Sequence, residues 1–463
     1  MKLSLKNFNT LVIIMGTVAL LFLWDIKFGI FQVRYLYLII FVTIISDFLL
    51  KRIFFTKVEI SFIFLFVFIL LSHLFLVLLI NDKNLDLYLI SSYVFFISIF
   101  LVTFVIHKEI INNLTSICLI FILIFTSSSF VSLYLNGPLI YEFCAGIPVD
   151  FVNNFFSKDF NNYSNHTMYT PGWRVSFNEF LFLESSHFGM IAPSILMYSL
   201  YKTYIKFNLI NIIILILFLL LLTFKLSTTF LVGFVFSASL IMLFNFKKIE
   251  TRLFIIYSLA ILIISSVLIT DHQCSSRLPY VDFIDKYMDK KRVENFEKKL
   301  KDIPVFQYYN EKVLGLDQAT SRHDTRTKEI MVHAKNIAKL SIIEKPLGWG
   351  LNQYYNAFNY YNGIIEIDIN DGYLLTHNAH DASNNFVKIL VEFGIFGILF
   401  FIFILYCLIS KKITIEEKIF LLPIILTQSI RGAGYFNGGF ILVFALLLTL
   451  VFYRTKFIFR KYL

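Results

Sequence analysis

The chain has 463 residues, of which 58% are hydrophobic and only 16% charged, with a formal net charge of +10 at pH 7. Apolar stretches of about 20 residues recur along its whole length, and each can span a bilayer as a helix. Composition therefore excludes a soluble domain built around one hydrophobic core. Because backbone groups in lipid need partners within their own segment, it predicts an all-α polytopic membrane protein.

About twelve membrane-spanning helices are expected from hydropathy. Five fall in an N-terminal block at residues 1–135, four in residues 187–270, and three in a C-terminal block at residues 385–463. The expected spans, in chain order, lie near residues 9–24, 35–50, 58–80, 87–106, 110–135, 187–205, 207–224, 226–245, 253–270, 385–409, 418–431 and 436–453.

The basic residues follow this arrangement, so the positive net charge is not interpreted as a nucleic-acid footprint. Lys and Arg gather in alternate connections, which the positive-inside rule assigns to the cytoplasm together with both termini. The residues on that side are Lys2, Lys6, Lys51, Arg52, Lys57, Lys202, Lys206, Lys247, Lys248, Arg252, Lys411, Lys412 and those from Arg454 to Lys461.

Two long segments, residues 136–186 and 271–384, are thereby assigned to the outside. Loops of this length are usually functional. The cytoplasmic connections are all short, and no GxxxxGK[ST] phosphate loop occurs in the sequence, which argues against ATP-driven transport. Cys144 and Cys274 lie in the two outer loops, and a disulfide between them is one possibility if the compartment is oxidising.

The second outer loop contains recognisable elements. Tyr287–Lys301 is a charged helical pattern, which fits either a solvated face or contact with anionic lipid or glycan. Ser321–Lys345 has the spacing of an amphipathic helix. Pro346–Gly350 (PLGWG) then predicts a tight turn. Gly348 and Gly350 either serve only that turn or let the backbone approach a phosphate or sugar closely.

Titratable groups stand where each outer loop returns to the membrane. Glu184–His187 precedes one expected span, and Thr376–Gly397 leads into another. A charged side chain at mid-helix costs about 2.5–3.5 kcal/mol on insertion scales, so these groups need a structural or chemical reason. A site at this boundary can meet water, a soluble sugar and a lipid head group together.

An ordered set of these pieces resembles the bacterial O-antigen polymerase and O-antigen ligase superfamily. The pieces are Arg326, the Pro346–Gly350 turn, His377-Asn378 and Glu392–Gly397 (EFGIFG). In the first outer loop, Arg174 and the run Glu184-Ser185-Ser186-His187-Phe188 are similar to the polymerase branch.

One departure separates the two branches. In the ligase pattern a His-Asn pair stands eleven residues before the first glycine of Gly-x-x-Gly. Here that position is Ser383-Asn384, and His377 and His380 stand further upstream. The departure weakens a ligase-type histidine assignment and favours a polymerase.

The resemblance implies a GT-C-like fold in the bacterial inner membrane, with two large periplasmic loops and a site that faces the periplasm. It implies an undecaprenyl-pyrophosphate-linked oligosaccharide as both donor and acceptor, membrane lipid as surroundings, and a chain-length-regulator co-polymerase as partner. No cofactor is expected. Asp368-Ile-Asn370 is a poor match to a metal site, so no catalytic metal is predicted. The resemblance and the need for only one displacement then imply a metal-independent inverting glycosyltransferase.

Candidate site residues follow from this chemistry. A lipid pyrophosphate leaving group needs cations, and guanidinium matches phosphate oxygens in a bidentate manner. A sugar hydroxyl acceptor benefits from a general base, for which Glu184 is the first candidate. The pyrophosphate candidates are Arg174, Arg326 and Arg431; the other base candidates are His187, His377 and His380; the substrate-binding candidates are Gly348, Gly350, Asn378 and Asn384.

Each candidate also has a structural interpretation. Arg174 could cap or pair within its loop, Arg326 could be solvated, and Arg431 could only mark an interface between the last two spans. Glu184 could be an interfacial carboxylate on the first turn of a span, where the helix dipole favours it, and His187 and His380 could be ordinary polar residues in first turns. Two rival functions remain at this stage: an O-antigen ligase, and a flippase for lipid-linked oligosaccharides.

Overall fold

The structure is a computed structural model, and its description covers only part of the chain. The described residues are 5–22, 27–28, 31–32, 40–42, 44–45, 55–80, 87–124, 126, 185–225, 228–245, 249–270, 334–362, 382, 384–432, 434–436 and 438–459. Most of the first outer loop and the first part of the second, including Cys144, Cys274 and Tyr287–Lys301, lie outside them.

The described part is helical apart from a two-stranded antiparallel pair, β1 (Lys27–Phe28) and β2 (Phe31–Gln32). Helices begin and end within a few residues of most of the expected spans. They are α1 (Leu5–Phe22), α3 (Lys57–Ile80), α4 (Leu87–Asn112), α8 (Ser185–Ile205), α9 (Leu209–Lys225), α10 (Thr228–Asn245), α11 (Ile249–Thr270), α16 (Tyr354–Asn362), α18 (Asn385–Phe393), α19 (Ile395–Ile409), α20 (Ile415–Ile430) and α21 (Phe440–Phe459).

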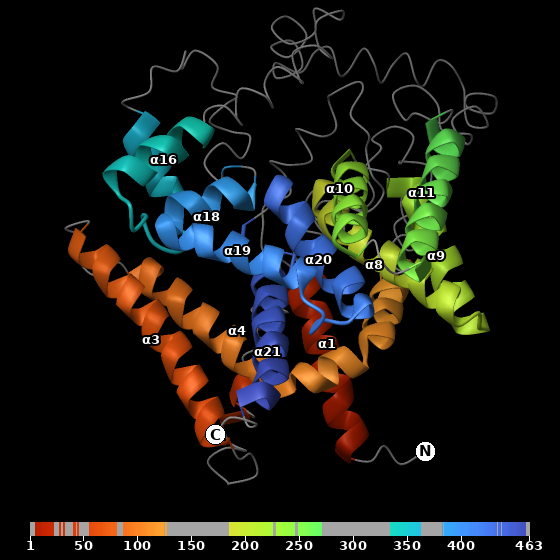
Figure 1. The fold of residues 1–463 in the computed structure, drawn as a ribbon, viewed down its shortest axis with the longest axis horizontal. Coiled ribbons are helices and arrows are strands. Elements are labelled where there is room, and N and C mark those ends of the chain that lie inside the picture. Colours follow the sequence, from red (N-terminus) through yellow and green to blue (C-terminus); the bar gives the residue numbers. More distant parts are fainter. Residues whose placement is uncertain are drawn as a thin grey trace, which may run out of the picture.

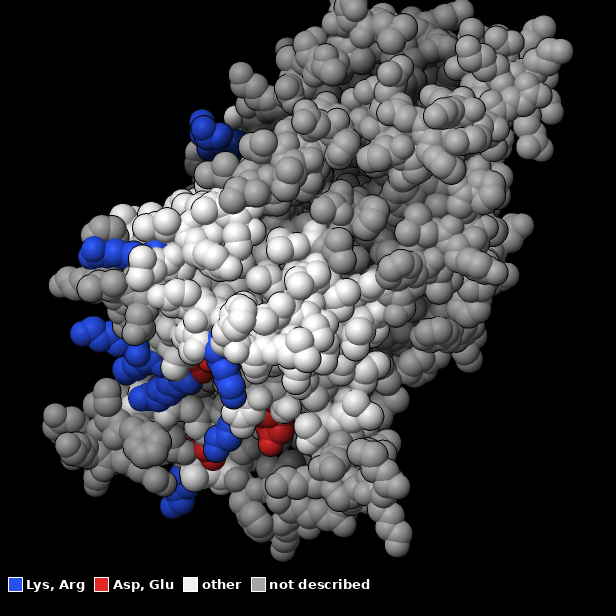
Figure 2. All heavy atoms as spheres, turned by 90° about the vertical axis from the view of Figure 1, so that its right-hand side faces the viewer, with Lys and Arg blue, Asp and Glu red and all other residues white. Residues whose placement is uncertain are grey.

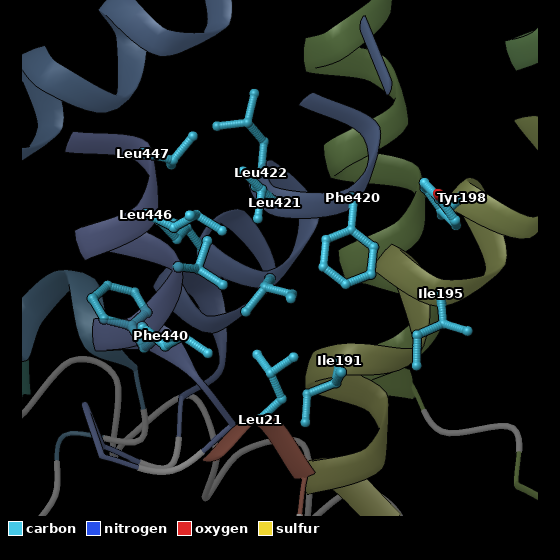
Figure 3. Packing of buried hydrophobic residues seen from close by; sticks show 14 of the residues in the cluster. Leu21, Ile191, Ile195, Tyr198, Phe420, Leu421, Leu422, Phe440, Leu446 and Leu447 are labelled. Atoms are coloured by element: carbon cyan, nitrogen blue, oxygen red, sulfur yellow. The ribbon is translucent and has the colours of Figure 1, made fainter. Parts of the chain in front are cut away.

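The centre of the molecule is formed by α8, α10 and α20, which pack on one another, while α21 packs on α4 and α9 packs on α8 (Figure 1). Buried aliphatic and aromatic side chains fill the space between them. Ile191 and Ile195 of α8 face Phe420 and Leu421 of α20 in one continuous apolar cluster (Figure 3). Helices in lipid associate through close van der Waals packing of complementary side chains, at the density of protein interiors.

Two hydrogen bonds fix the direction of α8 against α20. The Ser194 hydroxyl donates to the Phe420 carbonyl, and the Tyr198 hydroxyl donates to the Glu416 carboxylate over 3.1 Å. Residue numbers therefore rise along α8 as they fall along α20, so the helices are antiparallel. The first turn of α8 lies at the end of the bundle where α20 finishes.

The outer faces of the bundle are apolar. Large side chains of α3 and α19 are more than a third exposed, among them Phe64, Phe68, Leu399 and Ile402. Among the described residues, two helical segments, Lys57–Leu79 and Leu87–Asn112, are long and apolar enough to cross a membrane by length and composition. Figure 2 shows a broad uncharged surface, with most of its Lys and Arg side chains toward the lower end.

The expected span at residues 385–409 differs from the structure, because it consists of two helices that meet at Gly394. The backbone of Gly394 has φ of 53°, a conformation that few residues other than glycine adopt. The helical hydrogen-bond ladder stops there, since the Ile395 amide donates to the Pro346 carbonyl instead of continuing along the helix.

Candidate functional site

Two glycine-containing motifs, Pro346–Gly350 of the second outer loop and Glu392–Gly397 of the segment that follows it, pack directly against each other. Backbone hydrogen bonds join Trp349 to the Val391 carbonyl (3.0 Å), Gly350 to the Glu392 carbonyl (2.8 Å) and Ile395 to the Pro346 carbonyl (2.9 Å). The turn predicted at Pro346–Gly350 is present, and it occupies the break between α18 and α19. We call this paired segment, residues 346–350 and 391–395, the motif junction.

Glycine is required at the motif junction because the two backbones approach closely. A Cβ atom on Gly348 would lie 2.2 Å from the Glu392 carbonyl oxygen, and one on Gly394 would lie 2.0 Å from the Pro346 carbonyl oxygen. Gly348 and Gly350 also have φ of 84° and 97°. The structure thus supports a role of Gly348 and Gly350 in forming the turn and its packing, and their contact with substrate stays a prediction.

Glu392 is completely buried and anchors α16 to the motif junction. Its two carboxylate oxygens accept the backbone amides of Asn352 (2.7 Å) and Tyr354 (2.9 Å) at the N-terminal end of α16. These amides have no partner inside the helix, and the positive end of the helix dipole favours a carboxylate there. Lys388, one turn earlier on α18 and also buried, adds an attractive positive charge.

His73 and Tyr93 hold the turn from the side of α3 and α4. His73 Nε2 lies 2.8 Å from the Leu347 carbonyl oxygen, and because a carbonyl can only accept, this nitrogen carries the proton. His73 Nδ1 then accepts from the Tyr93 hydroxyl at 2.5 Å, and that oxygen accepts the Leu351 amide at 3.3 Å. His73 thus has hydrogen-bond partners for both ring nitrogens within the bundle.

Asn384, a substrate-binding candidate, is the N-cap of α18. Its Oδ1 accepts the Val387 amide at 2.8 Å, and its Nδ2 donates to the Ala382 carbonyl at 3.3 Å. An asparagine at this position stabilises the start of a helix by satisfying an amide that has no intrahelical partner. This contact gives Asn384 a structural role, and its contact with substrate stays a prediction.

Arg431 ends α20 beside the N-terminal turn of α18. The next residue, Gly432, packs so closely on Asn385 that a Cβ atom would lie 2.5 Å from the Asn385 amide oxygen. The Arg431 side chain is partly exposed, and it forms no ion pair with any residue within the described ranges. Arg431 is therefore a basic residue next in sequence to a contact with the N-terminal turn of α18, and helix N-termini favour anions.

The antiparallel packing of α8 and α20 brings another candidate to this end. Because Ser194 is level with Phe420 and Tyr198 with Glu416, the turn that contains His187 is level with the last turns of α20. His187 and Arg431 thus belong to segments at the same end of the bundle. Only the helical backbone of His187 is described.

The other candidates lie outside the described residues: Arg174, Glu184, Arg326, His377, Asn378 and His380. The amphipathic helix expected at Ser321–Lys345 is described from residue 334, where it continues to residue 344 with Ala334, Ile337 and Ala338 buried. Within the described ranges, no group of three or more His, Cys, Asp or Glu side chains has the geometry to hold a metal ion.

Sequence reasoning assigned no separate role to Glu392, Lys388 or Tyr93. The available signal was the placement of Lys388 and Glu392 four residues apart in an otherwise apolar helix, since charges that close to the membrane need partners. Tyr93 gave no signal, because a tyrosine within a Phe-rich helix is indistinguishable from an ordinary core aromatic.

Comparison with known families agrees with this arrangement. Residues 212–402 match the model of a family described as O-antigen ligase, a segment that runs from α9 into α19 and contains the whole motif junction. This match supports the similarity to the bacterial O-antigen polymerase and ligase family, whose members are membrane-embedded, glycosyltransferase-like enzymes. No curated protein and no solved structure shows significant similarity to the chain.

Proposed function

We propose that the protein is a polymerase of O-antigen or a related surface polysaccharide. It transfers the growing glycan from undecaprenyl pyrophosphate to a sugar hydroxyl of the next lipid-linked repeat unit, on the periplasmic side of the inner membrane. The observation that carries this proposal is the family match over residues 212–402, which includes the motif junction beside Arg431.

The proposed reaction is a single displacement at the anomeric carbon of the donor sugar. The acceptor hydroxyl attacks that carbon, its proton passes to a general base, and the bond to pyrophosphate breaks, so the configuration inverts and lipid pyrophosphate leaves. Arg174, Arg326 and Arg431 are proposed to stabilise the negative charge that develops on the leaving group. This clamp makes a divalent cation unnecessary for that step.

Glu184 is proposed as the base, with His187, His377 and His380 as the alternatives. Glu184 follows the apolar residues Phe180–Leu183, and partial loss of water keeps a carboxylate basic enough to accept a proton. Glu184→Gln should lower polymerisation by about 10²-fold or more while it leaves substrate binding nearly unchanged. Normal polymerisation in Glu184→Gln, together with an inactive His377→Ala or His380→Ala variant, would assign the base to a histidine.

A ligase that transfers the lipid-linked glycan to lipid A-core is the second candidate, because the family contains both activities. The placement of Ser383-Asn384 at the position of the ligase His-Asn pair favours the polymerase. A deletion strain separates the two. Loss of a polymerase leaves lipopolysaccharide core capped with a single repeat unit, whereas loss of a ligase leaves core without any cap.

A further inference from the structure

The helix α16 has an exposed face of unusual composition. Its nine residues are four tyrosines, three asparagines, one alanine and one phenylalanine (YYNAFNYYN). Tyr355 and Tyr360 are 56% and 51% exposed, and Asn359 between them is also exposed. With 3.6 residues per turn, these three residues and half-buried Asn356 cover about 140° of the helix circumference.

The opposite side of α16 is firmly packed. Tyr354, Ala357, Phe358 and Tyr361 are buried in a separate apolar cluster with Trp349 and the helix at residues 334–344. The N-terminal end is tied to Glu392, as described above. The exposed face is therefore presented by a rigid element, with the motif junction at its base.

The ring of Tyr360 is half exposed, yet its position is fixed by neighbours. It lies 5.3 Å from the Trp349 ring and 5.0 Å from the Tyr361 ring, measured between centroids. The Lys345 ammonium lies 3.7 Å from the centroid of Trp349 and 5.7 Å from that of Tyr360. A ring held in place before binding loses little freedom when a ligand packs on it.

Tyr88 extends this surface toward α4. It is 61% exposed, and its hydroxyl accepts a hydrogen bond of 2.6 Å from the side chain of Asn352, just before α16. The resulting surface presents aromatic rings, phenolic hydroxyls and side-chain amides, and the α16 face that we have described bears no formal charge.

We propose that this face of α16 binds the glycan part of the lipid-linked substrate, at a position remote from its pyrophosphate. Sugar C–H groups pack against the electron-rich faces of tyrosine rings, and sugar hydroxyls exchange hydrogen bonds with amides and phenols. An uncharged surface suits this ligand, whereas a pyrophosphate requires cations. The inference rests on the proposed function and adds a binding surface for the chain that is being extended.

Lipid head groups are the competing ligand for this face of α16, because tyrosine and tryptophan also line membrane interfaces. Two observations favour glycan. The exposed face of α16 contains asparagine and no aliphatic side chain, and α16 lies beyond the end of α3, on the opposite side of the molecule from both chain termini (Figure 1).

The test measures retention of lipid-free surface polysaccharide, released by mild acid from the bacterium that encodes the chain, on the immobilised full-length protein in nanodiscs. The double variant Tyr355→Ser, Tyr360→Ser should bind at least about tenfold more weakly, because both ring contacts are lost. The double Phe variant keeps the rings and should retain most of the binding. Tyr204→Ser, which changes a tyrosine that is 41% exposed at the far end of α8, should bind like the wild type.

Asn359→Ala is a second variant of the same face that should not unfold α16, because alanine favours a helix more than asparagine does. Weaker retention in this variant, with unchanged thermal unfolding, supports the inference. Unchanged retention in both the double Ser variant and Asn359→Ala overturns it. Unchanged retention combined with poorer insertion of the double Ser variant into anionic liposomes also overturns it, in favour of lipid contact.

Failure of the proposed function is distinguishable from failure of this inference. In cells, the double Ser variant should still join repeat units but give shorter chains than the wild type. A wild-type protein that binds polysaccharide through α16 yet joins no repeat units would contradict only the polymerase assignment. If the protein joins repeat units, but neither the chain length nor the glycan retention changes in the α16 variants, only the inference is contradicted.

Discussion

Glu392 accepts two backbone hydrogen bonds from residues about forty positions earlier in the chain. In the sequence Glu392 is only the first residue of the EFGIFG motif, and no neighbouring residue indicates which backbone amides will donate hydrogen bonds to it. Burial of a carboxylate without partners is costly, so the two amides and Lys388 account for its presence in an apolar helix. Residue roles of this kind depend on contacts distant in sequence, which local patterns do not contain.

Glu392→Gln should destabilise the protein by about 2–4 kcal/mol, because one of the two amides then faces an NH₂ group and Lys388 loses its negative neighbour. Thermal unfolding of the purified protein in detergent measures this effect. Glu416→Gln is the matched control, since Glu416 forms a partly exposed ion pair with Lys202 (2.6 Å). Loss of that pair should cost only about 0–1 kcal/mol. Equal effects of the two variants would contradict the anchoring role of Glu392.

Arg431→Ala should reduce polymerisation by about 10²-fold, the scale expected when one donor to a developing negative charge is removed. Arg431→Lys should restore only part of the activity, because a point charge does not reproduce the bidentate contact. Amounts of long-chain product at matched protein levels provide the measurement. Arg252→Ala, at the opposite end of the bundle, should have nearly normal activity. Full activity of Arg431→Ala would mean that Arg431 does not take part in the reaction.

The division between α18 and α19 shows what element-level patterns predict and what they miss. The run from Asn385 to Ile409 is apolar enough for one span, and the sequence analysis treated it as one. The break requires the Pro346 carbonyl to replace a helical acceptor for Ile395, and this carbonyl belongs to another part of the chain. By contrast, the turn at Pro346–Gly350 and the helix that precedes it were predictable, because proline and glycine act locally.

His73→Ala should loosen the motif junction without unfolding the bundle. It removes the hydrogen bond to Leu347 and leaves the Tyr93 hydroxyl without its acceptor. Limited trypsin digestion should then cut faster at Lys335 and Lys339, which are exposed on the helix that precedes the turn, and polymer yield should fall. His107→Ala is the control, because His107 Nδ1 hydrogen-bonds to the Phe104 carbonyl of its own helix at 2.8 Å and its ring stacks on Tyr453, away from the motif junction. Faster cutting in both variants alike would indicate general destabilisation instead.

At the scale of the whole molecule, charged side chains concentrate at one end of the bundle. Arg454 of α21 forms an ion pair with Glu417 of α20, and the buried Lys418 ammonium donates to the Leu408 carbonyl at 2.6 Å. The Lys202–Glu416 pair joins α8 to the same end. Lys202 and Arg454 belong to the set of basic residues that the positive-inside rule assigned to the cytoplasm, and the structure places both at this end of the bundle.

The opposite end holds α16 (Figure 1), to which the motif junction is joined through Glu392, and Arg431 is next to the contact of Gly432 with α18. Helix positions could be predicted because apolar runs are long and their limits are marked by polar residues. The attachment of the second loop to the bundle could not be predicted in this way. It depends on hydrogen bonds of His73, Tyr93 and Glu392 with the segment at residues 347–352.

The last prediction concerns orientation in the membrane. Reporter fusions after Lys248 and near Asn310 should give signals from opposite sides, with Lys248 in the cytoplasm and Asn310 in the periplasm, because α11 separates the two positions. Alkaline phosphatase activity is expected only at Asn310, and a cytoplasmic fluorescent reporter is expected to work only at Lys248. Signals from the same side would mean that α11 does not cross the membrane. Arg431 and α16 would then need a new assignment of side, since both are placed in the periplasm by the same count of basic residues.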